Sequence, residues 1–273
     1  MSLPPELISH VLAHLCDDPE LIQALCLVSK AWAFWCQAHL FKSVHLSPPT
    51  LKGWLENIPQ DAGGPASHTR TLTLEEYRLI HWINPQYPNF PLENLTCFSD
   101  VRSLSLIQWN TALFNGTSPE RYFCHFGKSL RSLNLRFCTL DPVIFFSFLS
   151  LLPNVEDLEI AYPHPHPTAP DSIPSVPRIT PSFCGTLSLV DINSVHLVLK
   201  ALARMPLRFS TIRIRGSTFY EPEVYQMLLT KCQETLVSLR FEGSYRGALR
   251  VHLEFIRPCS PSGGKNNIRS CPP

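Results

Sequence analysis

Apolar residues recur at helical spacing in three short segments within the first 41 residues. The segment 4–15 begins with two prolines that suit a first helical turn, and its apolar residues follow at intervals of three and four. Asp18, Pro19 and Glu20 combine a capping carboxylate, a proline and a first-turn acid, which predicts the start of a second helix. Ser29 can cap a third helix, which is apolar on more than one side. The pattern therefore predicts three short amphipathic helices.

These three helices are too short to bury all of their apolar surface among themselves. A chain of about 40 residues seldom closes a core without a metal, a disulfide or a partner. Each large apolar side chain left in water forgoes roughly 1.5 to 3 kcal/mol of stabilisation. We therefore expect part of this surface to form an interface with another protein.

A different pattern begins at Val44, where pairs of apolar residues separated by one other residue recur every 25 to 32 residues. This alternation is typical of a strand with one buried face. Helical segments that start at Asp141, Ser194 and Glu221 lie between several of the pairs. The spacing predicts repeated units that pack against their neighbours. The pairs are Val44/Leu46, Leu72/Leu74, Leu104/Leu106, Leu133/Leu135, Leu158/Ile160, Leu187/Leu189, Ile212/Ile214 and Leu239/Phe241.

Several of these units extend to a longer form that resembles the leucine-rich repeat. The fullest copy is Leu130-x-x-Leu133-x-Leu135-x-x-Cys138. In such a repeat the paired leucines point into the stack, and the residue between them points to the outer, concave side. An irregular α/β domain is the alternative, because a leucine-rich chain also produces such triplets by chance.

Two proline-dense segments, 83–91 and 161–181, interrupt the repeats. Proline at this density excludes a helix or a central strand, so we expect long surface loops. A polyproline II ligand is the alternative for the second segment. Val251 and Leu253 predict one last edge strand, and the polar, turn-rich residues 256–273 are typical of a disordered tail.

The opening LPPEL and the stretch LCLVSKAW from Leu25 to Trp32 make the first 41 residues resemble the F-box family. Trp35 and Cys36 depart from the family pattern, which often has polar or smaller residues there. The resemblance implies a three-helix module that docks on a Skp-type adaptor, itself bound to a cullin. The matching residues are Leu3, Pro4, Glu6, Leu7, Ile8, Val11, Leu12, Leu15, Leu21, Leu25, Val28, Ser29, Trp32, Leu40 and Phe41.

The same resemblance implies which side chains contact the adaptor. Trp32 would be divided between internal packing and the interface. An ordinary helical cap on a larger domain is the alternative, since the helices themselves do not distinguish the two. The implied adaptor contacts are Leu3, Pro4, Leu7, Leu21, Leu25, Val28 and Trp32.

Composition and charge reduce the number of functional classes that the chain could belong to. With 44% hydrophobic and 16% charged residues in 273, the chain is expected to fold. A net charge of +1 gives no electrostatic argument for nucleic acid or membrane. The start has no signal-peptide pattern, and the ten cysteines lie at least ten residues apart, without the pairing of a zinc site. We expect an intracellular protein with free thiols.

Candidate chemistry is sparse. The chain contains no GxSxG, GxxxxGK[ST] or GxGxxG motif. His10 and His14 have metal spacing on the first helix but lack the glutamate of HExxH. We therefore expect no catalytic residues, no metal and no cofactor, and we interpret the chain as a non-enzyme.

Charged residues stand between the paired apolar positions of several repeats, where a strand would present them on its outer face. Asp157 and Glu159 lie in a middle repeat, whereas Arg213, Arg215 and Arg240 lie in later ones. Such a face, acidic in the middle and basic toward the end, could select a target of complementary charge. These five residues are the candidate substrate contacts, with merely solvated charges as the alternative.

The sequence as a whole predicts an α/β chain with an N-terminal three-helix F-box followed by an irregular leucine-rich-repeat-like solenoid. The expected domains are an F-box at 1–41, a substrate-binding repeat domain at 42–255 and a disordered tail at 256–273. The expected function is the substrate-receptor subunit of a Skp/cullin/F-box type ubiquitin ligase that binds an unknown protein target. The alternative is an interaction scaffold with no ligase role.

Overall fold

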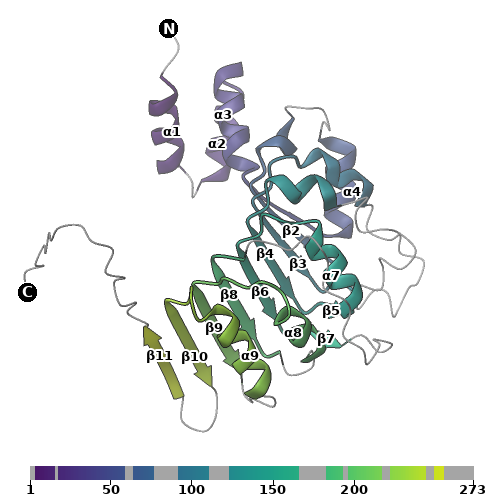
Figure 1. Cartoon of the computed structure of the whole chain (residues 1–273). Helices are drawn as coiled ribbons and strands as arrows, with labels where there is room; N and C mark the ends of the chain where they lie inside the picture. The colour runs from purple at the N-terminus through teal and green to yellow at the C-terminus, as the bar shows by residue number, and fades with distance from the viewer. Residues whose placement is uncertain are drawn as a thin grey trace, which may run out of the picture.

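The computed structural model describes residues 4–15, 18–58, 64–76, 92–110, 123–165, 183–192, 196–216, 222–243 and 249–254. Within these residues, one sheet contains the strands in the order β1-β2-β3-β4-β6-β8-β9-β10-β11. All neighbours from β1 to β10 pair in parallel, and β11 pairs antiparallel with β10. The architecture is therefore an α/β fold on an eight-strand parallel sheet (Figure 1).

The eight parallel strands of this sheet are short, and each coincides with one of the predicted apolar pairs. A separate pair of two-residue strands, β5 and β7, is also parallel. The strands are β1 (Ser43–Leu46), β2 (Thr71–Glu75), β3 (Ser103–Ile107), β4 (Ser132–Arg136), β5 (Thr139–Leu140), β6 (Asp157–Ala161), β7 (His164–Pro165), β8 (Thr186–Val190), β9 (Thr211–Gly216), β10 (Ser238–Gly243) and β11 (Leu249–Glu254).

Within the described residues, three helices lie at the start of the chain, and four more α-helices and several short 3-10 helices lie in the connections between strands. The α-helices are α1 (Pro5–His14), α2 (Pro19–Leu25), α3 (Lys30–Leu40), α4 (Pro48–Asn57), α7 (Pro142–Ser150), α8 (His196–Leu202) and α9 (Pro222–Cys232). The 3-10 helices are η1 (Pro65–His68), η2 (Leu92–Cys97) and η4 (Cys124–Lys128).

The two residues of each apolar pair are aligned across the sheet in a constant register. Leu104 lies opposite Leu72 on one side and Leu133 on the other, and the same alignment continues to β10. Strands β2, β3 and β8 bury every second residue. The sheet thus has one apolar face and one polar face, as the alternation predicted.

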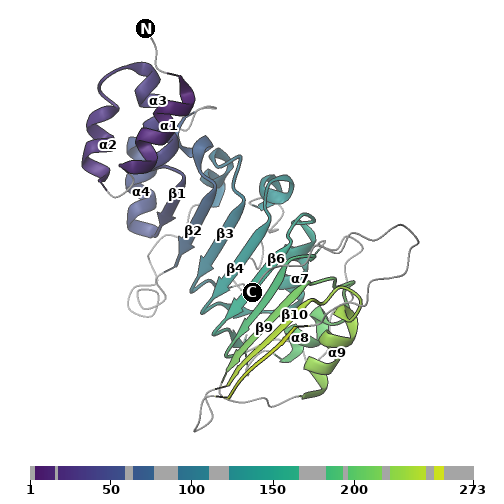
Figure 2. The same cartoon turned by 90° about the vertical axis from the view of Figure 1, so that its left-hand side faces the viewer.

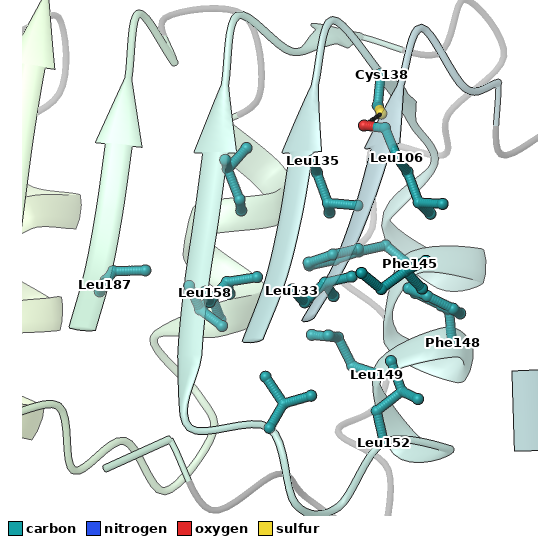
Figure 3. Close-up of a cluster of buried hydrophobic side chains, with 14 of the residues drawn as sticks. Leu106, Leu133, Leu135, Cys138, Phe145, Phe148, Leu149, Leu152, Leu158 and Leu187 are labelled. Atoms are coloured by element: carbon teal, nitrogen blue, oxygen red, sulfur yellow. Dashed lines mark hydrogen bonds between the residues drawn. The ribbon is translucent and has the colours of Figure 1, made fainter. Parts of the chain in front are cut away.

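Helices α7, α8 and α9 cover the apolar face (Figure 1). Figure 2 views the sheet from the other side, where no described helix lies in front of β4, β6, β9 or β10. The packing is clearest at α7, whose Phe145, Phe148 and Leu149 point toward Leu133 and neighbouring strand residues (Figure 3). Within the described residues, no helix therefore covers this second face of the sheet.

Capping residues start several helices where the sequence predicts them. The Asp141 carboxylate accepts hydrogen bonds from the backbone N–H groups of Val143 (2.8 Å) and Ile144 (3.2 Å). Asp18 and Ser29 cap α2 and α3 in the same manner. These bonds satisfy donors that a helix start otherwise leaves unpaired.

A left-handed residue follows each of the strands β3, β4, β6 and β8. These residues are Gln108, Phe137, Tyr162 and Asp191, with φ between 48° and 61°. Each backbone N–H donates to a carbonyl of the next strand at 2.8 to 2.9 Å. Each turn therefore adds one hydrogen bond to the parallel ladder beyond the end of its strand. The residue that donates this bond has a left-handed backbone conformation, which non-glycine residues rarely adopt.

The first three helices have a small core of their own. Ile8, Leu12, Ile22 and Cys36 are buried together, separately from the cluster that lies under the sheet. Helix α3 packs against α1, against α2 and against η1. The three helices lie beyond the β1 end of the sheet (Figure 2).

The fold-class prediction of a three-helix F-box followed by an irregular leucine-rich-repeat-like solenoid is wrong. The described residues form a single eight-strand parallel sheet with helices, and neither a separate F-box nor a solenoid is evident. The physical reason is that the strands join into one continuous ladder while the described parts of their connections differ, with α-helices in some and 3-10 helices in others. Helix α3 also packs on η1, so it belongs partly to the α/β body.

Smaller predictions have mixed outcomes. The last edge strand, predicted from Val251 and Leu253, is confirmed as β11, whereas α4 was not predicted. The loop predicted for 161–181 is wrong at its start, because Ala161 ends β6 and His164–Pro165 forms β7. Residues 83–91, 166–181 and 256–273 lie outside the described residues.

We expect Leu133→Ala to lower the free energy of unfolding by about 2 to 5 kcal/mol, because it opens a cavity where the side chain is fully buried. Ser105→Ala, on the polar face of the adjacent strand, is the control and is expected to change it by less than about 0.5 kcal/mol. Urea unfolding measures both. Equal effects would contradict the assignment of the two faces.

The burial of His125 is expected to make the folded protein less stable in acid. Burial lowers the pKa of this imidazole below its ordinary value of 6.5, and the nearby backbone of Leu95 opposes part of the shift. In the unfolded chain this imidazole therefore takes up a proton near pH 6.5, whereas in the folded chain it does so only at lower pH. The stability that depends on the neutral imidazole is complete above pH 6.5 and is lost as the pH falls below it. We expect His125→Gln to flatten the fall in free energy of unfolding between about pH 7 and pH 5. Parallel curves for the two proteins would refute this.

Candidate functional site

One row of side chains crosses the polar face of the sheet. Each member stands between the two residues of an apolar pair, and the constant register places the members next to one another. The row changes from hydroxyl side chains to charged ones toward the β10 end. From β1 to β10 it consists of His45, Thr73, Ser105, Asn134, Glu159, Ser188, Arg213 and Arg240.

A second row lies two residues further along the same strands. It carries Arg136 on β4, Arg215 on β9 and Glu242 on β10. Because alternate residues of a strand share a face, both rows point to the same side of the sheet. Charged side chains from two rows therefore gather over β4 to β10.

These side chains line a surface cavity of about 290 Å³, which we call the arginine pocket. Its lining residues come from β4, β6, β8, β9 and β10. Figure 2 shows β4, β6, β9 and β10 from the face that no described helix covers. Its polar lining consists of Arg136, Glu159, Ser188, Arg213, Arg215, Arg240 and Glu242.

Two ion pairs bracket the pocket. Arg136 donates to Glu159 from Nη2 at 2.9 Å and from Nε at 3.1 Å. Arg215 donates to Glu242 from Nε at 2.8 Å, and its Nη2 lies 2.8 Å from the same oxygen. The hydrogen bond and the negative charge of Glu242 raise the pKa of Arg215 above its ordinary value. Both pairs fix the direction of their arginine side chains more than they stabilise the fold, since they are partly exposed.

Arg213 and Arg240 differ from these two arginines. They lie directly beside each other in the register of β9 and β10, and both are exposed. Within the described residues, neither guanidinium has an ion pair or a hydrogen bond. Like charges at opposed positions of a sheet are destabilising. The pocket thus holds two positive charges that the described part of the fold does not neutralise.

The structure brings together four of the five substrate contacts that the sequence suggested: Glu159, Arg213, Arg215 and Arg240. Asp157 is not among them. Its carboxylate accepts a hydrogen bond from the backbone N–H of Thr186, and a side chain at Gly185 would collide with it. Asp157 therefore joins β6 to β8 instead of lining the pocket.

Sequence reasoning missed three polar lining residues, Arg136, Ser188 and Glu242. Ser188 occupies the same place between paired leucines as Arg213 does between isoleucines. Arg136 and Glu242 follow two residues after outward positions, so the period of two that identified Arg215 would also have found them.

A second surface lies on the first three helices, where apolar side chains remain in contact with water. The exposed fraction is 52% for Leu7, 42% for Leu21 and 64% for Val28. Pro4 is exposed, Leu25 and Trp32 are half-buried against the small core, and Leu3 lies outside the described residues. We call the exposed side chains the apolar helix surface, which consists of Pro4, Leu7, Val11, Leu21, Leu27, Val28 and Phe34.

Neither surface carries an obvious reaction centre. In the part of the chain that the structure describes, no group of three or more His, Cys, Asp or Glu residues could hold a metal ion. No helix found there has the length and apolar character needed to cross a bilayer. Comparison with known proteins adds no relative, because no family model, no curated protein and no solved structure matches the chain.

We expect Asp157→Ala to lower the free energy of unfolding by about 1 to 3 kcal/mol, because it leaves the Thr186 N–H without its acceptor. Glu159→Ala, two residues along the same strand, is the control and is expected to cost at most about 1 kcal/mol. Chemical unfolding of both variants measures the difference. A larger loss for Glu159→Ala would show that the roles of the two carboxylates are reversed.

Proposed function

We propose that the chain is the substrate-receptor subunit of a Skp/cullin/F-box type ubiquitin ligase. In this proposal the apolar helix surface binds a Skp-type adaptor, and the open face of the sheet holds a target protein. The observation that carries it is the exposure of apolar side chains on α1 and α2, in the segment whose sequence resembles the F-box family.

The distribution of buried and exposed residues supports an interface at this segment. Six of the eleven large apolar side chains that are exposed within the described residues lie between Leu7 and Phe34. Ile8 and Leu12, which also match the family pattern, are buried in the small core. Leu7 and Leu21, which the resemblance assigns to the adaptor, remain exposed. The same sequence pattern thus divides into residues that are buried among the helices and exposed residues that the proposal assigns to a partner.

Exposure of this many apolar side chains to water costs free energy unless a partner protein covers them. Soluble monomers rarely expose contiguous apolar patches, and larger patches mark interaction sites. Anchor side chains on short helices that enter a partner's groove are a recurrent mode of recognition. The adaptor's occupancy of this surface would therefore supply the burial that the three helices lack.

The proposed mechanism is proximity. The receptor holds its target close to a recruited ubiquitin-conjugating enzyme, and its own side chains make or break no bond. The proposal implies an intracellular location. Free thiols at all seven described cysteines are compatible with a reducing compartment.

We expect Leu7→Ala, Leu21→Ala and Val28→Ala, combined, to weaken adaptor binding by about two orders of magnitude or more, since several anchors of one interface are removed together. Co-purification and a titration with a purified Skp-type adaptor measure the loss. The exposed positions of the three side chains make the variant suitable, because truncation there opens no cavity in the core.

Met227→Ala with Val237→Ala is the matched control, because it truncates exposed apolar side chains elsewhere on the fold. This variant is expected to bind the adaptor as the unchanged protein does. Failure of the unchanged protein to bind any Skp-type adaptor would end the receptor proposal. Adaptor binding without recruitment of a cullin to the complex would favour the scaffold alternative.

A further inference from the structure

We infer that the arginine pocket is a binding site for a doubly charged oxyanion of the phosphomonoester class, held by Arg213 and Arg240. The inference concerns the open face of the sheet alone. It goes beyond the proposed receptor function and does not depend on adaptor binding.

The first argument is the placement of two unneutralised charges. Arg213 and Arg240 are register partners on adjacent parallel strands, so their backbones lie roughly 4.8 Å apart. Arg136 and Arg215 at the flanks each have a glutamate, whereas the central two have none within the described residues. Repulsion between them lowers stability in the absence of a ligand. A bound anion would remove that repulsion.

The second argument is the charge of the ligand that fits. Four arginines and two glutamates line the pocket, which leaves two positive charges in excess. A phosphomonoester carries a charge of about −1.5 to −2 at neutral pH, whereas a single carboxylate carries one negative charge. The excess is therefore matched by one phosphate group, while one aspartate or glutamate of a partner would neutralise only half of it.

The third argument is geometric. Each guanidinium presents a planar fork of N–H donors, and phosphate offers three terminal oxygens to such forks. Two forks from neighbouring strands can thus share one phosphate, with Ser188 on the next strand in register with Arg213 as a further donor. The arrangement uses side chains from three adjacent strands whose spacing the backbone ladder fixes.

The flanking glutamates argue against a nucleic acid as the ligand. Glu159 lies in the same row as the central arginines, two strands away from Arg213. Glu242 lies two residues beyond Arg240 on β10. A strand of regularly spaced phosphates would therefore meet Glu159 if it crossed the strands along this row, and Glu242 if it followed β10. The chain's net charge of +1 also lacks the basic excess typical of nucleic-acid binding.

The test uses the full chain and three fluorescently labelled peptide pools with random flanking residues. The pools differ only at the central residue, which is phosphoserine, glutamate or serine. Fluorescence anisotropy is expected to show tighter binding of the phosphoserine pool than of the serine pool by about tenfold or more, and tighter binding than of the glutamate pool. Free phosphoserine and inorganic phosphate are added as competitors, and both are expected to displace the pool.

Arg213→Gln combined with Arg240→Gln is expected to reduce phosphoserine-pool binding to the level of the serine pool. Arg204→Gln changes an exposed arginine outside the pocket and is expected to leave binding unchanged. Because the double variant removes two neighbouring like charges, its melting temperature is expected to be no lower than that of the unchanged protein. Added inorganic phosphate is expected to raise the melting temperature of the unchanged protein only.

Two arms identify the source of the phosphate group. Equal affinity for free phosphoserine and for the phosphoserine pool would identify the ligand as a free phosphomonoester. Tighter binding of the pool would identify it as a phosphorylated protein segment. Both outcomes support the anion site. Equal binding of the phosphoserine and glutamate pools would overturn it. So would unchanged binding by the double variant, or tighter binding of a single-stranded RNA that survives the double substitution.

Discussion

Hydrogen bonding between parallel strands in one constant register is the constraint on which the rest of this structure depends. Each strand pairs with the next at equivalent positions from β1 to β10. A shift of one residue would turn every leucine pair toward water, because side chains alternate between faces. The buried leucines and the helices packed on them therefore hold the register. In the same step they align the outward side chains into rows.

The arginine pocket is a product of this alignment. Its members come from five strands and are distant in sequence, yet they are neighbours because the register repeats. The Arg136–Glu159 bond spans 23 residues and the Arg215–Glu242 bond spans 27. Left-handed turns after four of the strands continue the ladder past the strand ends. Cys138 adds a thiol contact to the Leu106 carbonyl at 3.3 Å, so the turn after β4 is tied to β3 (Figure 3).

Local features of this fold could be predicted from the sequence, whereas its global arrangement could not. Caps at Asp18, Ser29 and Asp141 depend on bonds within one turn, so the sequence alone indicates them. The strands could be predicted because apolar and polar residues alternate in them with a period of two. The joining of those strands into one α/β sheet, which overturned the F-box and solenoid prediction, depends on connections whose sequences are unlike one another. In the pocket, the outward arginines were predictable, but which of them would lack a carboxylate partner depends on the neighbouring strand.

The reversal of β11 limits how far this ladder extends. A parallel edge in constant register is a template on which another strand can be added, and exposed edges of that kind promote association of separate chains. Strand β11 covers the β10 edge and runs in the opposite direction, so its own outer edge presents the hydrogen-bonding pattern of a reversed strand. A second copy therefore cannot pair its β1 directly with β10. One reversed strand thus acts against end-to-end polymerisation at that edge.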